Sequence, residues 1–96
     1  MKQPDVQTAL RIYLQYPRIG SSEIRELFGP IGNATVAKLK AKAREVMSER
    51  DVARYDAYMV DTECAYIAWG LDPADLEKRY VRLRKFNFSP AVPSEV

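Results

Sequence analysis

Apolar residues recur at every third or fourth position along most of this chain, and that spacing predicts amphipathic helices. In residues 5–15 the apolar side is formed by Val6, Ala9, Leu10, Tyr13 and Leu14. Pro4 and Pro17 lie just outside this segment, where proline is compatible with a helix boundary. The pattern therefore predicts a first helix over about 5–15.

Residues 21–47 predict a short helix, a tight turn and a longer helix. In residues 22–28, Ile24, Leu27 and Phe28 form one apolar stripe, and Ser21 or Ser22 is expected to be the N-cap. Residues 29–32 cannot continue this helix, because they contain Pro30 and two glycines. Asn33 is expected to cap the next helix, whose apolar face comprises Val36, Leu39, Ala43, Val46 and Met47.

The outer side of the longer helix is basic and carries small residues. A helical wheel places Ala34, Lys38, Ala41 and Glu45 opposite the apolar face, with Ala37 and Lys42 beside them. Small side chains let a helix backbone approach another surface closely, while lysines can reach phosphates or base edges. Alanine and lysine are also good helix formers, so a merely solvated face remains an alternative.

This arrangement resembles the helix-turn-helix of bacterial DNA-binding proteins, over about a quarter of the chain. The resemblance is carried by Gly29, by the apolar Ile31 in the turn, and by Thr35-Val36 early in the second helix. The turn is one residue longer than the common form, and Arg25 stands where a small alanine is usual. The resemblance implies a tri-helical core in which residues 5–15 cover the other two helices. A plain αα-hairpin is the alternative.

The resemblance also implies a site for double-stranded DNA. The beginning of helix 34–47 would enter the major groove, while the flanking serines and lysines would hold phosphates. The candidate DNA-binding residues are Ser21, Ser22, Asn33, Ala34, Thr35, Lys38, Lys42 and Arg44. Size and composition are similar to those of small transcriptional regulators of bacteria, phages and mobile elements, which often act as homodimers.

The second half of the chain is expected to be helical as well. Residues 48–60 contain neither glycine nor proline and predict a helix, followed by another over 63–69. Asp72 is a good cap and Pro73 a good first residue for a last helix that runs to about residue 86. Residues 62–86 could form a second helix-turn-helix-like pair or a plain helical hairpin. Residues 87–96 contain two prolines and predict a flexible tail.

No alternating strand pattern is present, so neither a sheet nor a wing is expected. The sequence thus predicts a single all-α domain over residues 1–86. It would have a wingless helix-turn-helix core over about 5–49 and a C-terminal helical extension over about 50–86.

Charge is distributed along the chain in blocks. Residues 31–50 carry a net charge of +3, residues 51–77 carry −6 and residues 78–86 carry +5, while the whole chain carries +2. Basic segments on either side of an acidic one could orient a polyanion. In the last helix, Lys78, Arg82 and Lys85 form a second basic face. This face could contact nucleic acid, or it could neutralise the acidic segment within the fold or across a dimer.

The residue inventory argues against catalysis. The chain has no histidine and one cysteine, which removes the usual catalytic triads and zinc sites. Asp72 and Asp75 are explained by helix capping rather than by a metal ion. An enzyme, a cofactor, a metal and a small-molecule substrate are therefore not expected. No apolar run is long enough for a membrane span, and a single cysteine fits the cytoplasm.

A second hypothesis keeps the helical fold and assigns a protein-binding function, such as a phage assembly, packaging or adaptor subunit. The acidic segment 51–69 would then form the interface, through its aromatic residues Tyr55, Tyr58, Tyr66 and Trp69. Stacking of these rings on a single nucleic-acid strand is disfavoured by the acidic surroundings. Packing in the core or between subunits is the favoured interpretation of these rings.

Overall fold

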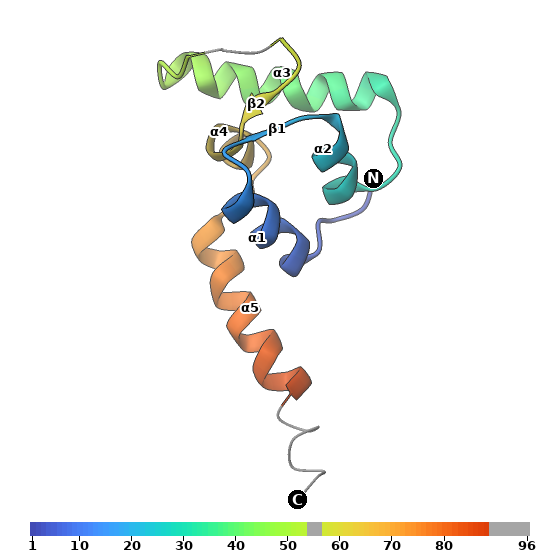
Figure 1. The fold of residues 1–96 in the computed structure, drawn as a ribbon, viewed down its shortest axis with the longest axis vertical. Helices are drawn as coiled ribbons and strands as arrows, with labels where there is room; N and C mark the ends of the chain where they lie inside the picture. The colour runs from blue at the N-terminus through green and yellow to red at the C-terminus, as the bar shows by residue number, and fades with distance from the viewer. Residues whose placement is uncertain (54–56, 89–96) are drawn as a thin grey trace, which may run out of the picture.

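The computed structural model describes residues 1–53 and 57–88, with side chains up to Lys85 in the last helix. The described part is mostly helical, as predicted (Figure 1). The helices are α1 (Val6–Gln15), α2 (Ser21–Phe28), α3 (Asn33–Glu49), α4 (Thr62–Ala68) and α5 (Pro73–Phe88). The first helix, the short helix and the turn after it lie where the apolar spacing placed them.

The prediction that the fold contains no sheet is wrong. Strands β1 (Arg18–Ile19) and β2 (Val60–Asp61) pair in antiparallel register, with Arg18 opposite Asp61 and Ile19 opposite Val60. Ile19 and Val60 are completely buried. Two-residue strands are too short to show an alternating pattern in sequence, so only the folded chain reveals them.

The prediction of a helix over 48–60 is also wrong, because α3 ends at Glu49. Asp51 takes a left-handed conformation with φ of +59°. The N–H of Asp51 donates to the Ser48 carbonyl (3.2 Å), and that of Val52 donates to the Met47 carbonyl (2.8 Å). This pair of bonds is a Schellman motif, which terminates a helix. Residues 54–56, including Tyr55, lie outside the described residues.

Two of the expected caps are replaced by glycines. The N-cap of α2 is Gly20 rather than a serine, and its N–H donates to the Glu23 carboxylate at 2.8 Å. The N-cap of α3 is Gly32, because the Asn33 side chain is engaged elsewhere. The cap expected at Asp72 is present, and Asp61 caps α4 in the same way: each carboxylate accepts a hydrogen bond from a backbone N–H in the following turn.

Helix α4 lies at the centre of the core. Tyr66 is completely buried, and its hydroxyl donates to the Ala9 carbonyl of α1 at 2.6 Å. The Trp69 indole donates to the Leu39 carbonyl of α3 at 2.9 Å and meets the Phe28 ring of α2 edge to face. Helices α1, α2 and α3 therefore share one core with α4, and α3 rests mainly on α4 and β2.

Helix α5 leaves this core along α1. Helix α4 ends at Ala68 with Trp69 as its C-cap, the φ of +75° at Gly70 permits the turn that follows, and α5 begins at Pro73 as predicted. Leu76 is buried, Tyr80 is half-buried, and α5 packs mainly on α1. Beyond that contact α5 projects away from the other helices (Figure 1). It continues to Phe88, so the tail expected over 87–96 is wrong for its first two residues, and residues 89–96 lie outside the described residues.

Candidate nucleic-acid interface

The outward face of α3 carries small and basic side chains. Ala34, Lys38, Ala41, Lys42 and Glu45 are all exposed. The opposite face is buried through Val36, Leu39, Ala43 and Met47. Helix α3 lies along one end of the molecule, with α2 and α4 on its inner side (Figure 1). The ridge of alanine and lysine expected from the helical wheel is therefore on the surface.

The inner side of α3 is fixed by contacts along its length. The Leu39 carbonyl accepts the Trp69 indole N–H, and the Met47 sulfur lies 3.4 Å from the backbone nitrogen of Asp61. These partners belong to α4 and β2, so both the middle and the end of α3 are tied to the core. A helix held in this way can present its outer face without reordering when it binds.

Arg25 ties the turn between α2 and α3. Its Nε donates to the Ile31 carbonyl at 3.1 Å, and its Nη2 donates to Oδ1 of Asn33 at 2.6 Å. The guanidinium therefore links α2 to the turn and to the first residue of α3. The Asn33 side chain is therefore bound to Arg25 and does not cap α3. No local pattern in the sequence indicates this role of Arg25.

Gly29 allows the chain to turn sharply at the end of α2. Its φ of +92° is accessible to glycine but unfavourable for other residues. A Cβ at this position would lie 3.4 Å from the Lys2 side chain. The N–H of Lys2 also donates to the Phe28 carbonyl at 3.0 Å, so the N-terminal segment packs against this turn.

The remaining candidate residues are not all on one face. Ser22 is exposed and Ser21 half-buried at the start of α2, while Thr35 is half-buried beside the exposed face of α3. At about 100° per residue, Asn33 and Arg44 lie on the opposite flank from Thr35. The Arg44 guanidinium donates to the Ala57 carbonyl at 2.5 Å and is turned toward the chain that follows α3. Arg44 is therefore separated from Lys38 and Lys42.

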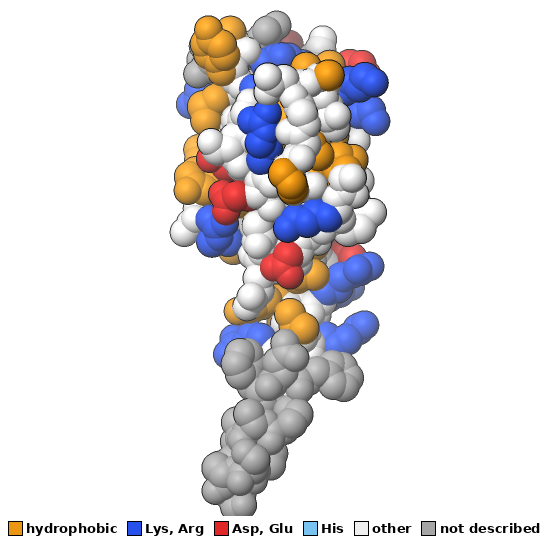
Figure 2. Space-filling model, turned by 90° about the vertical axis from the view of Figure 1, so that its right-hand side faces the viewer, with side chains coloured by type: hydrophobic (Ala, Val, Ile, Leu, Met, Phe, Trp, Pro, Cys, Tyr) orange, Lys and Arg blue, Asp and Glu red, His pale blue; other side chains and the backbone are white. Residues whose placement is uncertain are grey.

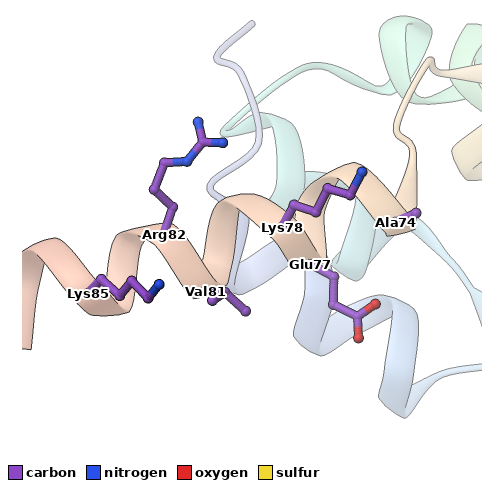
Figure 3. A pocket seen from close by; sticks show the side chains of 6 residues that line it. All are labelled: Ala74, Glu77, Lys78, Val81, Arg82 and Lys85. Carbon is purple, nitrogen blue, oxygen red and sulfur yellow. The ribbon is translucent and has the colours of Figure 1, made fainter.

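The second basic face is on the projecting part of α5. Lys78, Arg82 and Lys85 are exposed, and they line a shallow depression together with Ala74, Glu77 and Val81 (Figure 3). Figure 2 shows Lys and Arg side chains distributed over one side of the molecule, from its upper end down to the projecting helix. The helices that carry the two basic faces, α3 and α5, lie at different ends of the structure (Figure 1).

The aromatic residues of segment 51–69 are largely used within the core. Tyr66 is buried and Trp69 half-buried, which confirms core packing for these two rings. Tyr58 is 77% exposed. The carboxylate of Asp61 caps α4, and that of Glu63 lies 3.4 Å from the Arg50 guanidinium. Two of the four aromatic side chains expected to form a protein interface here, Tyr66 and Trp69, are therefore engaged inside the chain.

Cys64 and Tyr66 have clearly shifted pKa values, and both side chains lie in the core. Burial raises the pKa of the Cys64 thiol to about 11, and the adjacent Asp61 carboxylate adds to this shift. Burial also raises the pKa of the Tyr66 hydroxyl well above its ordinary value. Neither group lies on the exposed face of α3, so these shifts report on packing rather than on a reactive site.

No group of three His, Cys, Asp or Glu side chains in residues 1–53 and 57–88 is arranged to hold a metal ion. In the part of the chain that the structure describes, each helix is too short or too polar to cross a membrane. Comparison with known proteins finds no match to this chain among protein-family models, curated proteins or solved structures.

Proposed function

We propose that this chain binds double-stranded DNA, with α2 and α3 acting as a helix-turn-helix and the exposed face of α3 entering the major groove. The observation that carries the proposal is the exposed ridge of Ala34, Lys38, Ala41 and Lys42 on a helix whose other side is buried. In this function the chain is a small cytoplasmic regulator of transcription from a bacterium, a phage or a mobile element.

The dimensions of the two surfaces are compatible. An α-helix with its side chains is about 10–12 Å across, and the major groove is about 12 Å wide. Ala34 and Ala41 keep the outward side of α3 narrow, so the helix can approach the floor of the groove. Lys38 and Lys42 lie beside the alanines and are long enough to reach guanine edges or phosphates.

Arg25 positions α3 in this proposal. Its two hydrogen bonds fix the path of the turn, and hence the direction in which Asn33 and Ala34 leave it. Ser22, exposed at the start of α2, is available to a phosphate of the same duplex. A homodimer would place two copies of α3 in successive major grooves, about 34 Å apart.

The first test is duplex binding measured by fluorescence anisotropy at several salt concentrations. We expect the double variant Lys38→Gln/Lys42→Gln to bind at least tenfold more weakly. Its plot of log affinity against log salt should be shallower by about 2, because two phosphate contacts are lost. The variant should remain folded by circular dichroism, since both side chains are exposed.

The matched control is Arg11→Gln/Arg79→Gln, which removes two cations that already pair with Glu26 and Asp75. We expect this control to change affinity by less than about twofold. Equal losses in the two double variants would show that net charge, rather than α3, determines binding. Affinity that does not depend on salt would also contradict the proposal.

A further inference from the structure

The exposed part of α5 is a cationic helix, with Glu77 and Val81 beside its cations. Residues 78–85 contain five cations and no acidic residue. Asp75 neutralises Arg79 through an ion pair of 2.8 Å, while Lys78, Arg82 and Lys85 line one side of the helix. Val81, which is 53% exposed, is an apolar residue that lies between these cations. Protein interfaces are usually depleted of charge at their centre, so this composition fits a polyanion better.

The spacing of these cations matches a nucleic-acid strand. Lys78, Arg82 and Lys85 span about 10 Å of helix axis at about 1.5 Å per residue. One strand of a duplex presents a phosphate about every 3.4 Å along its axis, so about four consecutive phosphates span a similar length. Figure 3 shows Lys78 and Arg82 extending from the same side of α5, with Lys85 lying along the helix toward Val81. A second copy of this helix would bring like charges together.

Because of where α5 lies, its cations cannot contact the same duplex that α3 would hold. The exposed face of α3 points away from α4, whereas α5 leaves the molecule along α1 at the other end (Figure 1). Duplex DNA is stiff over lengths far greater than one small domain, with a persistence length of about 50 nm. A duplex lying on α3 would therefore not turn back to reach the cations of α5.

We propose that Lys78, Arg82 and Lys85 hold the phosphates of a second duplex segment, so that one copy of this chain bridges two segments of DNA. The inference rests on the proposed function, because α3 holds the first segment. The α5 contact is made with phosphates and is therefore independent of base sequence.

The test is a bridging assay with the full chain. One duplex is attached to beads, a second duplex carries a fluorophore, and the retained fluorescence is measured per bound protein. We expect Lys78→Gln/Arg82→Gln/Lys85→Gln to keep most of the affinity for a single duplex and to lose bridging at least tenfold. The Arg11→Gln/Arg79→Gln control should bridge like the unmodified chain.

Several outcomes would overturn the inference. If the triple variant still bridges, the α5 contact is absent, while the proposed function of α3 stands. If light scattering shows that the triple substitution converts a dimer to a monomer, the second basic face is a subunit contact instead. If poly-glutamate at equal charge concentration displaces the second duplex, the second basic face is suited to binding an acidic protein. If the unmodified chain binds no duplex, the proposed function itself fails.

Discussion

At the scale of single residues, the most informative side chain is Arg25. It is half-buried, and its guanidinium spans the turn with one bond to a backbone carbonyl and one to Asn33. A helical wheel alone assigns no role to an arginine at this position. The structure gives it one, which is to connect the end of α2 to the beginning of α3.

Replacing Arg25 with alanine should lower the free energy of unfolding by about 1–3 kcal/mol, because two hydrogen bonds are lost and the Ile31 carbonyl loses its partner. Urea denaturation measures this directly. Arg11→Ala is the control: its ion pair with Glu26 is exposed, so its loss should cost less than about 1 kcal/mol. Equal effects of the two substitutions would mean that Arg25 does not hold the turn.

Cys64 gives a pH dependence with a definite sign. Burial raises the pKa of its thiol from 9.0 to about 11, so the folded chain holds this proton more tightly than the unfolded chain. The resulting stability is fully present below pH 9 and is lost as the pH rises toward 11. At pH 10 the loss should be about 1 kcal/mol.

The measurement for Cys64 is urea denaturation at pH 7.5, 9 and 10, for the unmodified chain and for Cys64→Ala. The decline between pH 9 and 10 should be shallower in the variant, which has no thiol to titrate. Parallel declines would show that the thiol does not contribute, and that the common titration of other groups explains the change.

At the scale of elements, the apolar repeat predicts where helices run but not always where they end. Gly70 has a φ of +75°, a conformation that favours glycine, so this residue type indicates in the sequence that α4 ends just before it. Asp51, just after the end of α3, has the same left-handed conformation, with a φ of +59°. Its residue type does not indicate in the sequence that a helix ends there. The helix expected over 48–60 therefore stops early, and the chain is free to return and form β2.

These two positions predict opposite effects on stability. Asp51→Gly should stabilise the chain by about 0.5–1 kcal/mol, because glycine adopts the left-handed conformation without the steric cost. Gly70→Ala should destabilise it by about 1 kcal/mol, although a Cβ there would meet no atom within 4 Å. Thermal or urea denaturation of both variants tests this, and a change of the same sign in both would refute it.

The exposed face of α3 could be predicted from sequence, because a helical wheel separates Lys38 and Lys42 from the buried Leu39 and Ala43. Contacts between distant parts of the chain could not. Arg44 is drawn toward Ala57 only because the chain folds back after α3. Likewise, the bond from Tyr66 to the Ala9 carbonyl joins residues that no local pattern relates.

At the scale of the whole molecule, α4 brings the two halves of the chain together. The predicted core over residues 5–49 buries its apolar residues against Val60, Cys64, Ala65 and Tyr66, all from the second half. Exposed lysines and arginines lie on α3 and on the projecting end of α5, two helices at different ends of the molecule (Figure 1). Under the proposed function, the first of these helices reads a groove and the second contacts phosphates.

The central claim is that α3 enters the major groove, where the N7 atom of guanine is exposed. Its most direct test is protection of guanine N7 from dimethyl sulfate in a duplex selected for binding from a random library. The unmodified chain should protect a short, defined group of guanines, and Lys38→Gln/Lys42→Gln should lose that protection. A bound duplex with every guanine N7 still reactive would contradict the claim, as would protection that is unchanged in the variant.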